Sequence, residues 1–451
     1  MVMVGKLLRF GRRQLHTIIS RETIKPANLT PNSHPHTYNL SEIDLLANRA
    51  YIPLYLFYPN NDGCSLTAND KATLLKKSLS MSLTKYYHFA GRLPAQTTPY
   101  IECNDEGVVF VEARNDSELD RFRLVSAKDG DFDQLFPDEM VCYESRNNAN
   151  LVGVQVNHFA CGGVGLAVSM SHIVGDACTL GSFVNHWAYV ALYGSTEHKE
   201  VLPLNPYFIQ FPKTNSLLLE PHAANQKNNN HVMKKFMFPN SKLSDLKKII
   251  VSTAAGSLNN PTRVESLTAL LYKTAVAAAA TNNSGHFNPS YLLIMADIRQ
   301  KFVEKLPQTT VGNFVSMMMV PTRNKTEISL SMLVDEIKKQ KVKLEGVENV
   351  QQAAEKLKLV QSKLGSEDFE HVVKGTYGGT SLCGFPFSKA DFGWGKPMAA
   401  GVALRSAGAN GFMLMDSPEG DGIEAHVTLE KKDMDVFQND KELLSFCQIN
   451  I

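Results

Sequence analysis

Apolar residues recur at helical spacing in several parts of the chain. Between Asp70 and Tyr86, the side chains of Leu74, Leu75, Leu79 and Leu83 fall on one side of a helix. The same periodicity predicts helices over residues 176–192, 242–251, 263–280, 331–343 and 350–364. We therefore expect amphipathic helices that lie on the surface of a larger core.

Short apolar runs between turn signals predict strands. Residues 100–103 and 107–111 flank an Asn-Asp-Glu-Gly turn and predict a hairpin, and residues 151–159 and 165–170 flank a Cys-Gly-Gly turn. Further strands are predicted over residues 232–238, 291–298, 311–320, 398–402, 411–416 and 422–428. Periodicity fails over residues 196–230, which are rich in proline and asparagine. We expect an α/β protein in two halves, with mixed sheets flanked by helices and a crossover at 196–230.

Composition and charge exclude some classes of protein for this chain. The 451 residues allow two large domains or up to about four smaller ones. With 46 basic and 45 acidic residues the formal net charge is +1, which provides no polycationic field for nucleic acid or an acidic membrane. No apolar run approaches the roughly 18 residues that a membrane span requires. We expect a monomer without a nucleic-acid or membrane partner.

The cysteines and the N-terminal residues give indications of the cellular compartment in which the protein resides. The seven cysteines are odd in number, scattered and free of any CxxC pair, which disfavours a disulfide framework and a zinc site. A reducing compartment fits this pattern, and we expect the cytoplasm. Residues 1–17 form a basic leader with no acid before Glu22. Two interpretations of the leader stay open, a weak organelle-targeting helix and a dispensable extension.

A histidine stands at a strand-to-helix junction, in Ser171-His172-Ile173-Val174-Gly175-Asp176. With an ordinary pKa near 6.5, an imidazole at a strand end is suited to take a proton from a hydroxyl. From spacing alone, a core histidine bonded to backbone remains the simpler interpretation. A metal site is disfavoured because no third ligand and no H-E-x-x-H motif lie nearby.

A second motif reads Asp391-Phe392-Gly393-Trp394-Gly395-Lys396-Pro397. Two glycines around one of only two tryptophans indicate closely packed backbone and a rigid indole whose N–H needs an acceptor. A tight structural corner and a functional indole both remain open. The segment 379–384 is one residue too long for G-x-S-x-G, and no dinucleotide fingerprint or P-loop is present.

Together and in this order, the H-x-x-x-D and D-F-G-W-G motifs resemble those of the plant BAHD acyl-CoA-dependent acyltransferases. Further stretches similar to the family extend over about residues 18–450, among them Ala90-Gly91-Arg92, Phe159 to Gly163, Gly312-Asn313 and Asp421 to Ala425. The alkaloid O-acetyltransferase branch is the most similar, because of Leu306-Pro307-Gln308 and of Cys383 with Phe385-Pro386-Phe387.

The resemblance implies two chloramphenicol-acetyltransferase-like domains with a channel between them. Coenzyme A would enter from one side and the acceptor alcohol from the other. We expect an N-terminal domain over residues 18–195, joined by about 390–410, and a C-terminal domain over 231–451. The expected reaction is acetyl transfer from acetyl-CoA, a co-substrate, to a hydroxyl of an alkaloid or similar metabolite. No permanently bound cofactor and no metal are implied.

The resemblance also implies roles for single residues. His172 matches the general base, and Trp394 is the candidate indole donor to the tetrahedral oxyanion. Asp176 matches an aspartate that points away from the channel and pairs with an arginine, here Arg299. Structural support of a turn is expected from Asp391, Gly393 and Gly395. Candidates for contact with coenzyme A are Thr380 and Ser381.

Departures from the family pattern leave alternatives open. Leu382, Gly384 and Ser388 replace a tryptophan, an arginine and a tyrosine near the expected coenzyme site. Asp297 stands where relatives have asparagine, and we expect it to compete with Asp176 for Arg299. Transfer of malonyl or another acyl group, N-acylation, and a non-catalytic binding protein on the same scaffold are the alternatives.

Overall fold

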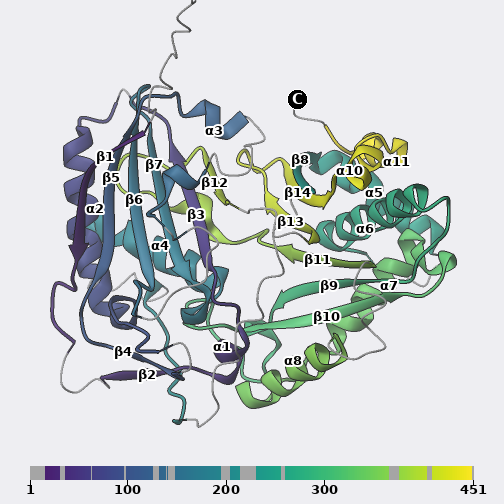
Figure 1. Cartoon of the computed structure of the whole chain (residues 1–451), viewed down its shortest axis with the longest axis horizontal. Helices are drawn as coiled ribbons and strands as arrows, with labels where there is room; N and C mark the ends of the chain where they lie inside the picture. The colour runs from purple at the N-terminus through teal and green to yellow at the C-terminus, as the bar shows by residue number, and fades with distance from the viewer. Residues whose placement is uncertain are drawn as a thin grey trace, which may run out of the picture.

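The structure is a computed structural model. It describes residues 16–30, 36–61, 63–95, 98–124, 132–138, 140, 148–194, 204–213, 230–254, 260–364, 375–403 and 409–448. Two α/β halves stand side by side, and each is built on a six-stranded mixed sheet (Figure 1). The two-domain α/β fold class expected from the sequence is confirmed.

The first sheet carries most of the N-terminal half. Its strands, in spatial order, are β1 (His16–Ile24), β5 (Val108–Asn115), β6 (Val152–Phe159), β7 (Val164–Ser171), β3 (Tyr51–Tyr58) and β12 (Ala399–Val402). All residues of β3 and β7 are buried, because both faces of these inner strands are covered. Helices α2 (Ala68–Lys85) and α4 (Ala177–Tyr193) pack against each other and share the core of this half. A separate pair joins β2 (Thr37–Asn39) to β4 (Tyr100–Glu102).

The second sheet carries the C-terminal half. Its order is β10 (Val315–Thr322), β9 (Ser290–Asp297), β11 (Thr376–Ser381), β13 (Asn410–Asp416), β14 (Gly422–Glu430) and β8 (His231–Pro239). One hydrophobic core joins this sheet to five helices, α5 (Asn240–Thr253), α6 (Arg263–Asn282), α7 (Leu330–Val342), α10 (Lys431–Phe437) and α11 (Lys441–Phe446).

Two short elements tie the halves together. β12 follows the 391–397 motif and pairs antiparallel with β3, which is the return to the N-terminal sheet that the family resemblance implies. Helix α1 (Glu42–Leu46) belongs to the N-terminal half but contacts α8 (Val350–Leu364) of the other half. Both elements frame the seam between the sheets (Figure 1).

Side-chain caps fix where several helices begin. Thr67 and Asp70 form a capping box at α2, and Thr262 and Glu265 form one at α6. Each box satisfies backbone N–H groups that the first helical turn leaves free. At α4 the cap is Asp176, whose carboxylate accepts from the Thr179 N–H. A motif aspartate therefore also sets the start of a helix.

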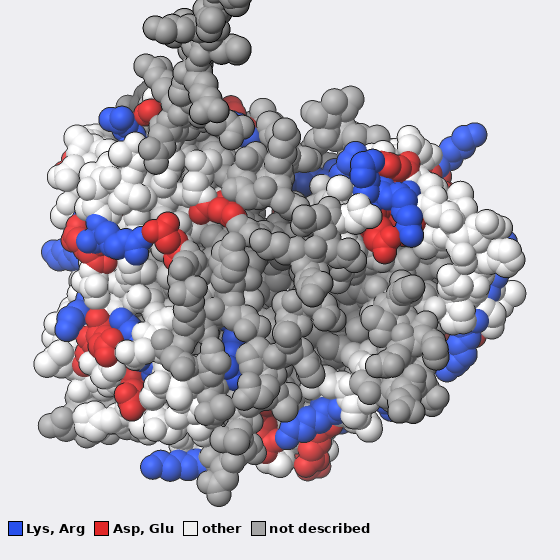
Figure 2. All heavy atoms as spheres, in the orientation of Figure 1, with Lys and Arg blue, Asp and Glu red and all other residues white. Residues whose placement is uncertain are grey.

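Acidic and basic side chains are interspersed over the described part of the face in Figure 2, in keeping with the net charge of +1. Among the described helices, none combines the length and apolar character needed to cross a membrane.

Several predicted elements differ from the structure. The hairpin predicted from residues 100–103 and 107–111 is wrong, because β4 pairs with β2 while β5 lies in the large sheet between β1 and β6. Strand β10 begins at Val315 rather than 311 because residues 311–314 turn to contact the other half. The expected domain boundary at 18 falls inside β1. Residues 1–15 and most of the 196–230 crossover lie outside the described residues.

Candidate active site

His172 lies where the last residue of β7 gives way to a short 3-10 turn, η3 (His172–Val174). Its backbone N–H donates to the Ala50 carbonyl at 2.9 Å, which anchors the turn to the start of β3. The next residues pack tightly, since a Cβ at Gly175 would lie 2.6 Å from the Thr179 methyl group. The His172 side chain remains partly exposed, while both of its sequence neighbours are buried.

The Asn313 side chain determines which ring nitrogen of His172 carries the proton. Its amide NH₂ donates to the His172 carbonyl at 2.7 Å and to Asp44 Oδ1 at 2.9 Å. Both partners are acceptors, so the amide oxygen must face the ring, where it lies 3.0 Å from Nδ1. Nδ1 therefore donates to Asn313, and the lone pair of the neutral ring sits on Nε2. That nitrogen has no hydrogen-bond partner among the described residues and is not a buried atom.

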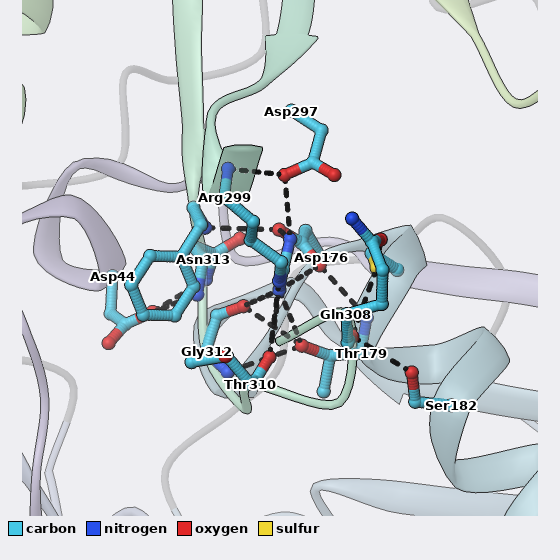
Figure 3. Close-up of polar contacts among 12 residues, drawn as sticks. Asp44, Asp176, Thr179, Ser182, Asp297, Arg299, Gln308, Thr310, Gly312 and Asn313 are labelled. Atoms are coloured by element: carbon cyan, nitrogen blue, oxygen red, sulfur yellow. Dashed lines mark hydrogen bonds and ion pairs between the residues drawn. The ribbon is translucent and has the colours of Figure 1, made fainter. Parts of the chain in front are cut away.

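Asp44 holds Asn313 in place from the other half of the molecule. The carboxylate, 1% exposed, accepts from both the backbone N–H and the side-chain amide of Asn313. Its second oxygen accepts from the Ser41 N–H at 2.8 Å, within the capping box of α1. Burial raises the pKa of Asp44, although the hydrogen bonds from Ser41 and Asn313 oppose this rise. Figure 3 shows the contact between Asp44 and Asn313. With the Ser41 and His172 contacts at its two ends, the result is a continuous polar chain from α1 to the His172 ring.

Asp176 and Arg299 form a buried ion pair behind the histidine turn (Figure 3). Arg299, from the turn η5 (Arg299–Lys301), donates to both carboxylate oxygens of Asp176 at 2.8 and 3.0 Å. Arg299 Nη2 also donates to the carbonyls of Thr310 and Gly312. Phe314 N–H donates to the Asp176 carboxylate, so the pair ties the start of α4 in one half to the 310–314 segment of the other.

The charges in this cluster reinforce each other. Burial alone would raise the pKa of Asp176, but the charge and hydrogen bonds of Arg299, together with the N–H groups of Phe314 and Thr179, outweigh burial and lower it. In the same way the pKa of Arg299 is raised, so both groups stay ionised. Asp297 accepts from Arg299 Nη1 at 3.1 Å without displacing Asp176. The expected acid beside Arg299 is confirmed, and both aspartates are bonded because the guanidinium offers enough N–H groups for both.

A thiol also lies close to this ion pair. The Cys178 sulfur contacts the Gln308 carbonyl at 3.3 Å, and burial raises the pKa of Cys178 to about 12. A thiol in that state supplies almost no thiolate at neutral pH, so Cys178 is not suited to act as a nucleophile.

Trp394 is not part of this cluster. Its ring packs 5.9 Å from the ring of Tyr58, which is paired with Val164. The His172 turn instead follows Ser171, which is paired with Tyr51, seven residues and about 23 Å away along β3. Helix α4 gives the same separation, because Asp176 caps its start whereas Gly393 faces Leu192 near its end.

The oxyanion role expected for Trp394 is therefore wrong. The indole is 4% exposed in the N-terminal core, and its N–H has no partner among the described residues. It stacks with Phe392 at 5.7 Å, and the Lys71 ammonium lies 5.7 Å from the ring centroid. An indole held in this way contributes to packing and cannot reach a carbonyl beside His172.

The rest of the second motif forms a turn. Asp391 Oδ1 accepts from the N–H groups of Gly393 and Gly395 at 2.8 and 3.0 Å. Both glycines have positive φ angles of 104° and 102°, which residues with a side chain rarely adopt. The turn thus places β12 against β3 and lies away from the histidine.

The candidate coenzyme contacts lie at the end of β11. Thr380 and Ser381 are partly exposed, and the Ser381 hydroxyl accepts from the Cys383 N–H at 3.3 Å. Leu382, which replaces a tryptophan of the family pattern, is 8% exposed and packs with the N-terminal core. The end of β11 therefore reaches the seam between the halves.

Sequence reasoning missed Asn313 and Asp44 as site residues. A signal for each was available, since Ser41-x-x-Asp44 is the pattern of a capping box and Asn313 interrupts an apolar run. Neither signal indicates that the two side chains meet across the seam. Within the described ranges no group of three or more His, Cys, Asp or Glu side chains is arranged to hold a metal ion.

Comparisons with known proteins agree with this arrangement. The model of the Transferase family matches residues 16–444. The chain is similar to deacetylvindoline O-acetyltransferase of Catharanthus roseus, with 32% identity over 95% of this chain and 97% of the relative. It is also 32% identical to 17,18-epoxy-17-hydroxycur-19-ene N-malonyltransferase of Strychnos nux-vomica, over 96% and 90% of the two chains.

Among solved structures, the crystal structure of vinorine synthase superimposes with a TM-score of 0.79 and 27% identity, covering 96% of this chain and 99% of that one. The family match spans both halves of the molecule, including the His172 turn and the Asp391 turn. The chain belongs to the Transferase family, the BAHD acyltransferases, and is an acyltransferase.

Proposed function

We propose that this acyltransferase moves an acyl group from acyl-CoA to a hydroxyl and that His172 is its general base. One observation carries the proposal, the hydrogen bond between His172 Nδ1 and the Asn313 amide oxygen. Because that bond keeps the proton on Nδ1, the ring presents the lone pair of Nε2 to an incoming hydroxyl. The Nε2 atom is also free of protein partners in the described part of the chain.

In the proposed reaction, Nε2 accepts the hydroxyl proton while the acceptor oxygen attacks the thioester carbonyl. The tetrahedral intermediate then collapses, the carbon–sulfur bond breaks, and the imidazolium returns the proton to the leaving thiolate. General acid–base catalysis of this type contributes about 10² to 10⁴ in rate. Holding both substrates together supplies a further advantage, so no covalent acyl-enzyme is required.

Asp176 and Arg299 have a positioning role in this proposal. Their ion pair lies behind the turn, and Asp176 bonds to Arg299, Thr179 N–H and Phe314 N–H rather than to the His172 ring. It therefore fixes the backbone around His172 and does not relay a proton.

We propose acetyl-CoA as the donor and a hydroxyl of a monoterpene indole alkaloid or similar metabolite as the acceptor. The likeness to deacetylvindoline O-acetyltransferase supports this choice. Thr380 and Ser381 are the proposed contacts for pantetheine. The cysteines described in the structure are unpaired, which supports a reducing compartment, and we place a monomeric enzyme in the cytoplasm.

Malonyl transfer to nitrogen is the second candidate, favoured by the equal likeness to the N-malonyltransferase of Strychnos nux-vomica. An amine acceptor needs the same base, so the geometry around His172 fits both reactions. The donor and the atom acylated distinguish them.

A matrix of donors and acceptors tests the proposal. The protein is incubated with acetyl-CoA, malonyl-CoA and longer acyl-CoA thioesters, each with indole alkaloids that carry a free hydroxyl or a free amine. We expect O-acetylated products identified by mass and fragmentation. Preferential malonyl or N-linked products would replace the acetyl proposal, and folded protein that transfers no acyl group to any acceptor would overturn acyl transfer itself.

A further inference from the structure

A separate cavity lies at the seam between the two halves. Its volume is about 610 Å³, within the range of pockets that hold small organic molecules. Three parts of the chain line it: residues 40–42 before and at the start of α1, residues 209–213 of the crossover, and residues 302–306 and 348–351 of the C-terminal half. Neither His172 nor Asn313 is among the lining residues.

The walls of the cavity are largely apolar. Leu40 comes from the N-terminal half, Ile209 and Phe211 from the crossover, and Phe302 and Leu306 from the C-terminal half. Leu40 and Phe302 are almost fully buried, at 1% and 7% exposed, so these walls are fixed by the cores behind them. The cavity therefore suits a ligand with a rigid hydrocarbon or aromatic body.

Acidic side chains predominate among the charged groups of the lining. The carboxylates of Glu42, Glu304 and Glu348 line the cavity with a single ammonium, that of Lys213. Glu42 is paired with Lys358 at 2.6 Å, whereas Glu304 and Glu348 are exposed and form no ion pair with any other described residue. This arrangement attracts a cation and repels the phosphates of coenzyme A.

The cavity wall is connected to the proposed base by three hydrogen-bonded steps. Ser41, in the wall, donates its N–H to Asp44, which holds Asn313, which in turn faces the His172 ring. On the other side, Leu306 N–H donates to the Arg299 carbonyl at 3.0 Å. The cavity wall and the His172 turn are thus joined by the same network of hydrogen bonds.

We propose that this cavity binds an organic ammonium ion with an apolar body, at a site separate from the His172 turn. The inference goes beyond the proposed function, because the residues that line the cavity include neither His172 nor Asn313. Apolar walls hold the carbon skeleton, and Glu304 and Glu348 select the positive charge. Coenzyme A binds elsewhere.

Equilibrium binding of a model cation tests the proposal. The probe is gramine, an indole that carries a protonated dimethylamine, and its neutral match is 3-isobutylindole. Binding of each is measured by calorimetry to the full chain and to the double variant Glu304→Gln/Glu348→Gln. The matched control is Glu355→Gln, an exposed glutamate of α8 outside the cavity. We expect the double variant to weaken gramine about five- to tenfold and raised salt to weaken it further, since these carboxylates are screened by water.

The neutral indole should bind equally to all three proteins, and saturating coenzyme A should not displace gramine. Equal gramine affinity in the wild type and the double variant, or displacement by coenzyme A, would overturn the proposal.

In a second variant, Ile209→Trp, the added ring fills the cavity and should abolish binding of both indoles. Unchanged binding there would place the site elsewhere. Binding as expected without any acyl transfer would refute the proposed function alone, whereas transfer with charge-independent binding would refute the cation site alone.

Discussion

The two motifs of this chain lie at opposite ends of helix α4 and strand β3, and the first is surrounded by polar groups whereas the second is surrounded by aromatic rings. At the start of α4, Asp176 sits in a network of charges and amides that crosses between the halves. Near the end of α4, Trp394 packs among aromatic rings within one half. A shared family signature therefore does not imply a shared site. The first motif orients the proposed base, and the second joins a strand to a sheet.

Replacement of the proposed base, at the polar end of α4 around His172 and Asp176, should have the largest effect on the reaction rate. His172→Ala should lower kcat at least about 100-fold, because proton removal from the acceptor is lost. Steady-state rates with an accepted alcohol measure this, and calorimetry checks that coenzyme A still binds. The matched control is His286→Ala, an exposed histidine outside the site. A rate for His172→Ala within a few-fold of wild type would remove the base assignment.

Removal of the buried Arg299 guanidinium tests whether its ion pair with Asp176 also stabilises the contact between the two halves. Arg299→Met leaves Asp176 buried without its partner and should cost about 3 to 5 kcal/mol of the free energy of unfolding. Denaturant unfolding measures the change. Lys339→Met removes an exposed pair with Asp335 as the control and should change stability little. A similarly small change for Arg299→Met would show that the ion pair does not hold the halves together.

Loss of the amide that orients the ring should have a smaller effect on rate. Asn313→Ala leaves His172 in place but frees its tautomer, and kcat should fall about tenfold, equivalent to one hydrogen bond of about 1.4 kcal/mol. KM for the acyl-CoA should stay constant, because the coenzyme contacts proposed at Thr380 and Ser381 are untouched. An unchanged kcat would mean that the imidazole needs no partner at Nδ1.

Substitution of Trp394, which packs among aromatic rings near the end of α4, should have the smallest effect on kcat. Trp394→Phe removes an N–H that has no acceptor among the described residues and keeps an aromatic ring in the core. We expect kcat within about threefold of wild type, whereas loss of an oxyanion donor would cost about 100- to 1,000-fold. Rates of this variant and of His172→Ala, measured in parallel, sharpen the contrast between the two ends. A fall of 100-fold would return the indole to the site.

The sequence predicted local structure well where one periodicity dominates. The boundaries predicted for α8 match the structure, and the histidine was placed correctly at the end of a strand. Strand β3 was missed, although it lies between β7 and β12 in the first sheet, because a fully buried strand shows no alternation. β11, rich in glycine and polar residues, lacks an apolar run and was also missed.

Long-range placement was harder to predict. Nothing local indicates that β4 pairs with β2 rather than with β5, because strand pairing depends on the register of distant segments. Asp44 and Asn313 are 269 residues apart, and their contact follows only from the docking of the two halves. The error over Trp394 has the same origin, since a motif gives residue types but no distance to the base.

The protonation state of one ring tests the central claim most directly and needs no knowledge of the acceptor. ¹⁵N NMR of histidine-labelled protein, with His172 assigned by comparison with His172→Gln, reports which ring nitrogen carries the proton in the neutral imidazole. The account predicts a proton on Nδ1 and a free lone pair on Nε2, and loss of that preference in Asn313→Ala. A His172 ring protonated on Nε2 would contradict it.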